Sequence, residues 1–168
     1  NLDMSERNKN WSTSNDVKNI ESIEGIQCLG NNAIQLDLTN LDALKSLNGI
    51  QNLQKLEVLS VSGEKLSDIS ALKGLQSLKK LKIGRNNLQN LKGIKMLPKL
   101  EILDICAPIV KSLDGLNDII ALDKMVIDCD KLNSLKGIES LPKLEILDIY
   151  ARIVKSLDGL KNLTALDK

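Results

Sequence analysis

Apolar residues recur along most of the chain with a period of 22 residues. Within each regular repeat, positions 1, 4, 6, 11, 14, 17 and 20 are all Leu, Ile, Val or Met. A coil formed by one repeat does not bury its apolar face alone, so the coils are predicted to stack into a solenoid with a continuous core. The regular repeats begin at Leu56, Leu78, Leu100, Leu122 and Leu144; a slightly longer repeat begins at Ala33, after a partial one from Ile20.

The spacing within a repeat predicts a short strand followed by a narrow, turn-rich segment. Leu103 and Ile105 alternate with other residues, which is the period of a strand. From Val110 onward, the apolar residues recur every three positions, which fits a 3₁₀ turn or an extended spiral better than an α-helix. A glycine two residues after position 14, such as Gly137, marks the place where the backbone is expected to bend.

These repeats resemble leucine-rich repeats, as in LKKLKIGRNNLQNLKGIKMLPK at residues 78–99. Their length is similar to that of the subclass shared by bacterial internalin-like surface proteins and the eukaryotic regulator of the type-one protein phosphatase. The stretch IESIEGIQCLGNNAIQLDLTNL at residues 20–41 resembles an internalin-like entry into the repeats. The resemblance implies an α/β-type solenoid with a curved parallel β-sheet on its concave side and 3₁₀ or extended segments on its convex side.

The chain departs from this family pattern in two places. The asparagine that the family carries at repeat position 9 is present at Asn86, whereas Glu64, Pro108, Asp130 and Arg152 replace it elsewhere. The N-terminal segment is also too short for the helical cap domain of internalins. We expect residues 1–19 to form a polar segment or partial cap, and residues 20–168 to form the solenoid, with one partial and six full repeats of 22–23 residues.

A longer period of two repeats is superposed on the first. Residues 91–124 and 135–168 are identical at 26 of 34 positions, which indicates the duplication of a two-coil unit. The chain ends at the opening of another repeat, without the polar cap that a terminal repeat needs for solubility. We expect either that the natural chain continues or that another molecule covers this edge. A second copy of the chain, associating through the uncapped C-terminal repeat, is one such molecule.

The composition argues against an enzyme. The chain has no His, which removes the commonest general base and metal ligand, and no Ser–His or Cys–His pair is available. Asp104 and Asp148 would lie two strands apart, about 9.6 Å, but a shallow sheet offers no enclosed pocket that would raise one pKa. Asp128 and Asp130 lack the spacing of a metal-binding loop. We therefore predict no catalytic site, no cofactor and no bound metal.

The net charge and the cysteine content limit the classes of partner and the cellular compartments that we expect for this chain. The net charge is +1, which argues against nucleic acid or an anionic membrane as the main partner, and no apolar run is long enough to span a bilayer. The three cysteines are expected to be small buried or half-buried hydrophobic residues rather than a disulfide framework. A bacterial secreted or cell-surface location is favoured by the resemblance, and a cytosolic location is the alternative.

The outward side chains at repeat positions 3, 5 and 7 define the surface that we call the concave face. A basic strip on it adjoins an acidic and apolar one, a mixture typical of protein-binding patches. We predict a protein ligand of unknown identity, with Tyr150 as the principal contact. The alternatives are a cytosolic phosphatase-regulator-like subunit, a spacer that stacks through open solenoid ends, and a face whose charges merely maintain solubility. The candidate binding residues are Ser60, Lys80, Lys82, Arg85, Ile102, Asp104, Lys124, Val126, Asp128, Ile146, Asp148 and Tyr150.

Overall fold

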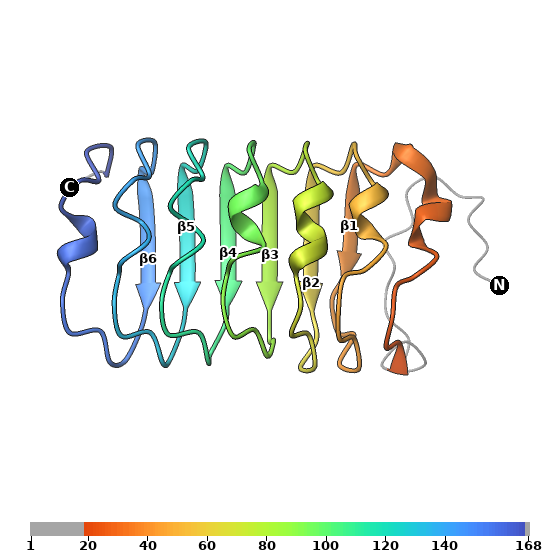
Figure 1. Cartoon of the computed structure of the whole chain (residues 1–168), viewed down its shortest axis with the longest axis horizontal. Coiled ribbons are helices and arrows are strands. Elements are labelled where there is room, and N and C mark those ends of the chain that lie inside the picture. The colour runs from red at the N-terminus through yellow and green to blue at the C-terminus, as the bar shows by residue number, and fades with distance from the viewer. Residues whose placement is uncertain (1–18, 167–168) are drawn as a thin grey trace.

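The computed structural model describes residues 19–166 and forms a solenoid of stacked coils (Figure 1). Each coil contributes one strand to a single parallel sheet, and the strands follow one another in sequence order. The predicted solenoid with a parallel sheet is therefore confirmed, whereas the predicted N-terminal segment lies, except for its last residue, outside the described residues. The strands are β1 (Gln35–Leu38), β2 (Val58–Ser62), β3 (Lys80–Gly84), β4 (Ile102–Cys106), β5 (Lys124–Asp128) and β6 (Ile146–Tyr150).

Short 3₁₀ helices lie on the side of the coils opposite the sheet (Figure 1). They fall within the part of the repeat where apolar residues recur every three positions, because three residues make one 3₁₀ turn. In the repeats that begin at Leu100 and Leu122, the equivalent segments consist of turns instead. The 3₁₀ helices are η2 (Ile26–Asn32), η3 (Ile50–Asn52), η4 (Ser70–Gly74), η5 (Ile94–Met96) and η6 (Asp158–Leu160).

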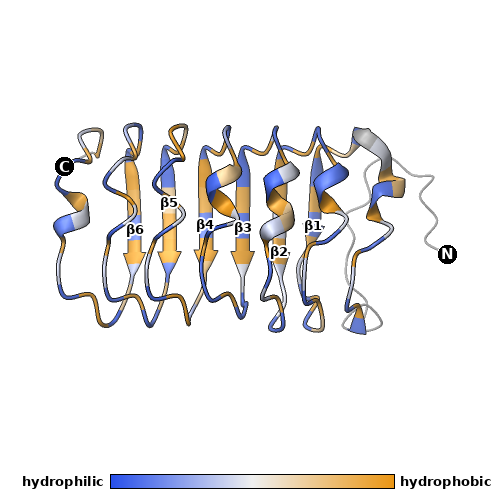
Figure 2. Cartoon of the chain, viewed as in Figure 1, coloured by the Kyte–Doolittle hydropathy of each residue, from blue (hydrophilic) through white to orange (hydrophobic). Residues whose placement is uncertain are grey.

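The core is one continuous cluster of buried residues built from the repeated apolar positions. Hydrophobic residues recur along successive coils of the ribbon (Figure 2). At repeat position 4, Leu81, Leu103 and Met125 have no exposed surface and stand in register on β3, β4 and β5. The last repeat is different, because β6 is the final described strand and has a neighbour on one side only. Its Leu147 is half-buried, and the side chain of Leu157 is 66% exposed.

The repeated glycines permit neighbouring coils to approach closely. Gly137 has a φ of 107°, and a Cβ at this position would collide with the carbonyl oxygen of Leu113 in the preceding coil. Gly93 has a φ of −66°, which any residue adopts, yet a Cβ there would collide with the carbonyl oxygen of Ile69. The predicted bend therefore explains only part of the glycine pattern, and the contact between coils explains the rest.

Backbone hydrogen bonds replace the missing asparagines at the turns after the strands. The backbone N–H of Ala107 donates to the carbonyl of Asp128, and that of Cys129 donates to the carbonyl of Tyr150, both at 2.9 Å. Asn86 keeps the family arrangement: its side-chain amide donates to the carbonyl of Cys106, and its side-chain oxygen accepts from a backbone N–H. The turns thus satisfy their backbone groups without a full asparagine ladder, as buried polar groups require.

Candidate protein-binding face

The register of the sheet places the candidate residues in three cross-strand rows. Each row runs along the solenoid, one residue per strand, because paired residues on β2 to β6 are 22 positions apart. Among the candidates, Arg85 lies outside the strands, directly after β3, with a φ of 27°. From β2 to β6, the rows are Val58, Lys80, Ile102, Lys124 and Ile146; Ser60, Lys82, Asp104, Val126 and Asp148; and Ser62, Gly84, Cys106, Asp128 and Tyr150. In the third row, the register of β3 and β4 ends one residue before Gly84 and Cys106.

The apolar members of this face are most exposed on β6. The side chain of Tyr150 is 63% exposed and that of Ile146 is 47% exposed, whereas Ile102 and Val126 are half-buried. Ile146 and Ile102 occupy the same repeat position, so their difference follows from the place of β6 at the end of the described sheet. The exposed aromatic ring and the exposed isoleucine lie at opposite ends of one strand.

Charged residues on the face are partly paired with one another. Lys82 Nζ on β3 lies 3.0 Å from Asp104 Oδ2 on β4. At the margin of the face, Arg152 Nε lies 2.8 Å from Asp130 Oδ1, so two residues that replace the family asparagine form an ion pair. Both pairs are substantially exposed, and each therefore contributes only about 0–1 kcal/mol to stability.

Comparison with solved structures identifies the repeat family. Internalin C2 from Listeria monocytogenes aligns with a TM-score of 0.63 and 26% identity, over 89% of this chain and 75% of internalin C2. A leucine-rich repeat protein from Leptospira interrogans aligns with a TM-score of 0.63 and 25% identity, over 77% of this chain and 38% of that protein. The chain is a leucine-rich repeat protein similar to the internalins. No protein-family model and no curated protein matches the chain.

A third solved structure shares the fold of this leucine-rich repeat protein. TLR13, solved in a complex with ssRNA13, aligns with a TM-score of 0.64 and 19% identity, over 85% of this chain and 25% of the receptor. At that identity the similarity extends to the fold alone. The predicted resemblance to leucine-rich repeat proteins of the internalin type is thus confirmed.

The cysteines of the leucine-rich repeat protein are free thiols in three different environments. Cys129 is buried, and burial raises its pKa to about 11, whereas Cys28 is exposed. Cys106 is half-buried on the concave face, with its thiol 3.8 Å from a carboxylate oxygen of Asp128; burial, and then that carboxylate, raise its pKa. Both raised values keep these thiols protonated at neutral pH. The expectation of buried or half-buried cysteines is wrong for Cys28.

Two carboxylates of the concave face, those of Asp104 and Asp148, lie on strands that are not adjacent. Asp104 and Asp148 lie on β4 and β6 with Val126 between them in register, and Lys82 neutralises Asp104. Within residues 19–166, no group of three or more His, Cys, Asp or Glu side chains is placed to hold a metal ion. In the same residues, no helix combines the length and the hydropathy needed to cross a membrane.

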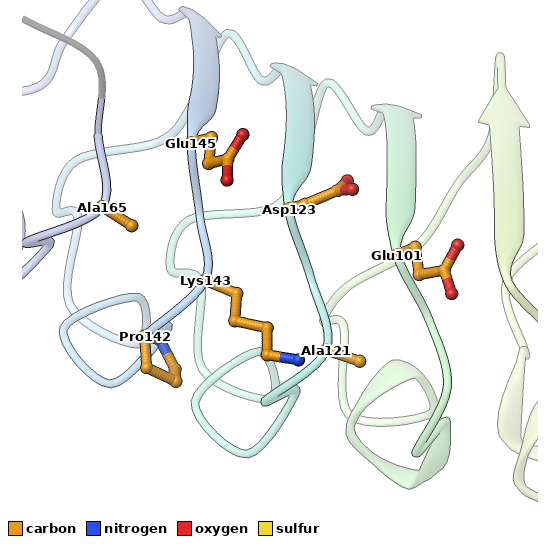
Figure 3. A pocket seen from close by; sticks show the side chains of 7 residues that line it. All are labelled: Glu101, Ala121, Asp123, Pro142, Lys143, Glu145 and Ala165. Atoms are coloured by element: carbon orange, nitrogen blue, oxygen red, sulfur yellow. The ribbon is translucent and has the colours of Figure 1, made fainter.

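The sequence patterns above did not identify a shallow hollow of about 540 Å³ beside the starts of β4, β5 and β6 (Figure 3). Three acidic side chains, Glu101, Asp123 and Glu145, stand there at equivalent places on consecutive coils. The signal was present, because repeat position 2 is acidic in three successive repeats. Ala121, Pro142, Lys143 and Ala165 complete the lining of this hollow.

Proposed function

We propose that this chain is a non-enzymatic recognition module that binds a protein ligand on its concave face. The observation that carries the proposal is the interleaving of exposed apolar and charged side chains on β4 to β6. Tyr150 and Ile146 expose much of their surface on β6. Asp148 lies between them along the strand, and Asp128 is in register with Tyr150. Partly exposed aromatic and aliphatic side chains among charges are typical of the anchor residues of protein interfaces.

The charge distribution favours a protein over a nucleic acid. Among the basic candidates of the face, Lys80, Lys82 and Arg85 cluster at β3 and Lys124 lies on β5. Asp104 already neutralises Lys82. Asp128 and Asp148 lie toward the opposite end of the face, on β5 and β6, and the whole chain carries a net charge of only +1. Nucleic-acid binding depends on many unneutralised Lys and Arg side chains in contact with phosphates. The RNA-bound TLR13 structure supports the fold as a recognition scaffold, and the acidic end of this face favours a different ligand.

A double variant tests this proposal. Tyr150→Ala with Asp148→Lys removes the main anchor and inverts a neighbouring charge, and we expect it to weaken binding to a purified protein partner about 100-fold or more. Calorimetric titration measures the change. The matched control is Asn117→Ala with Asp118→Lys, which makes the same change of charge at two exposed residues outside the sheet. Unchanged affinity in the Tyr150 variant would contradict the proposed role of the concave face.

A second candidate function is assembly through the last coil. Its motivation is the exposed apolar surface there, where Leu157 and Ile153 are 66% and 50% exposed. A second copy of the chain that stacks on this coil would bury that surface and gain hydrophobic free energy. Sedimentation velocity over a range of concentrations tests this candidate, with Leu157→Lys expected to reduce association. A monomer at high protein concentration would rule it out.

A further inference from the structure

The duplicated two-coil unit places the same Ile-x-Asp sequence twice on the concave face, on β4 and again on β6. Asp104 and Asp148 are the equivalent carboxylates, and each occupies the middle cross-strand row. On the strand before each copy, repeat position 3 is also the same, Lys80 on β3 and Lys124 on β5. The two copies are thus matched environments that differ at a few neighbouring positions.

The decisive difference lies directly opposite the aspartate. Lys82 on β3 is in register with Asp104 and forms an ion pair with it, with 3.0 Å between Nζ and Oδ2. In the second copy, Val126 on β5 stands at the place of Lys82, in register with Asp148. Within residues 19–166, the exposed Asp148 carboxylate has no ion pair and no hydrogen bond.

The lysine that both copies share does not replace the missing partner. Lys80 stands at repeat position 3 before Asp104, yet Asp104 is paired with Lys82 and not with Lys80. Lys124 has the same place relative to Asp148 and, by this geometry, also stays apart from it. The first copy therefore shows where a cation is held against the aspartate at repeat position 5: on the preceding strand, at the residue in register with the aspartate.

The surroundings of Asp148 are suited to a cationic side chain from another molecule. Exposed Asp128 on β5 replaces Gly84 of the first copy, which adds a second negative charge. Tyr150 replaces Cys106 and supplies an exposed aromatic ring, and such rings attract cations. The stem of a long basic side chain also gains from contact with apolar groups such as Val126 and Ile146.

We propose that the protein ligand inserts an Arg or Lys side chain against Asp148, at the place that Lys82 occupies beside Asp104. Its aliphatic stem lies over Val126 and Ile146, and its charged head lies between Asp148, Asp128 and the ring of Tyr150. This inference rests on the proposed function and adds the chemistry of the ligand: a basic residue flanked by apolar ones. The Lys82–Asp104 pair is the internal template of that contact.

Peptides from a random library displayed on phage provide the probe. The library is selected on the intact chain, and the affinities of the selected peptides are measured by fluorescence anisotropy for four variants. Asp148→Asn removes the carboxylate, and Val126→Lys supplies an internal partner for it. Each variant is expected to weaken binding about five- to tenfold. Asp118→Asn removes an exposed carboxylate outside the sheet; it is the matched control and is expected to leave binding unchanged. Lys82→Val frees Asp104 and is expected to allow a second basic contact.

The results distinguish the inference about a basic ligand residue from the proposed function on which it rests. Enrichment of Arg or Lys beside apolar residues, with loss of affinity in Asp148→Asn but not in Asp118→Asn, supports the inference. Peptides that require Tyr150 but lack this enrichment, or equal effects of the two asparagine variants, overturn the inference and leave the proposed function intact. Selection of no peptide that is sensitive to the Tyr150→Ala, Asp148→Lys double variant removes both.

Discussion

Individual side chains in this solenoid are constrained by the residues one repeat before and after them. Leu81, Leu103 and Met125 fill equivalent slots in successive coils and are fully buried. A phenylalanine would overfill such a slot, because the coils share one cross-section and a core tolerates added volume poorly. This constraint accounts for a chain with 42% apolar residues and only 1% aromatic ones. It also explains why Tyr150 occurs on the surface, where its volume is not limited.

Glycine substitutions separate the two constraints that act on the repeated glycines. Gly137→Ala introduces both a left-handed backbone strain and a collision with Leu113, whereas Gly93→Ala introduces a collision with Ile69 alone. We expect each collision to cost about 1–3 kcal/mol of unfolding free energy, and the positive φ to add about 1–2 kcal/mol for Gly137→Ala. Urea unfolding measures both. Equal losses would show that the backbone conformation of Gly137 carries no cost.

At the scale of the element, the turns after the strands use two different means to join adjacent coils. Asn86 is buried and bridges its own turn to the next coil through its side chain. In the last repeats, the equivalent residues Asp130 and Arg152 form an exposed ion pair, and the backbone N–H of Cys129 donates to the carbonyl of Tyr150. β3 pairs with β4 over four residue pairs and β5 pairs with β6 over five, so the parallel sheet forms with either means.

Removal of each turn residue is expected to have different costs. Asn86→Ala leaves the carbonyl of Cys106 and the N–H of Leu88 without their side-chain partner, which we expect to cost about 1–3 kcal/mol of unfolding free energy. Asp130→Ala breaks an exposed ion pair and is expected to cost about 0–1 kcal/mol. Thermal or urea unfolding measures the two variants side by side. A larger loss for Asp130→Ala would be inconsistent with this account of the turns.

For the whole molecule, stability is a property of the stack rather than of any one coil. Among the described strands and 3₁₀ helices, contacts between elements join only those of adjacent coils. Repeat proteins of this kind behave as one-dimensional arrays in which interfaces between neighbours supply most of the stability. Among the described coils, the one that contains β6 has its apolar residues least buried.

This arrangement predicts a gradient of hydrogen exchange along the solenoid. Backbone amides of β6 are expected to exchange with solvent faster than those of β3 and β4, because β6 is supported on one side only and opens at a lower free energy. Mass spectrometry of exchanged and digested protein would resolve the strands. Uniform protection from β3 to β6 would indicate that the stack opens as a single unit.

Much of this architecture was predictable from the periodic pattern. The repeat of 22 residues predicted the buried positions of β2 to β5 and the outward positions 3, 5 and 7, because a strand alternates its side chains and coils of equal length stack in register. The binding role of the twelve candidate residues remains a prediction. The exposed state of Cys28 was not predictable, because it lies in η2 before the regular repeats begin.

The sequence alone determined the solenoid, the inward and outward faces of its strands and the residues that each face presents, since all of these follow from the period of the apolar positions. Only the tertiary structure decided how equivalent residues differ. Leu103 is buried and Leu147 half-buried at the same repeat position, and Asp104 is paired whereas Asp148 is not. The reason is physical: burial and ion pairing depend on which side chains the adjacent coil brings within reach, and that is set by the stacking of coils rather than by the repeat itself.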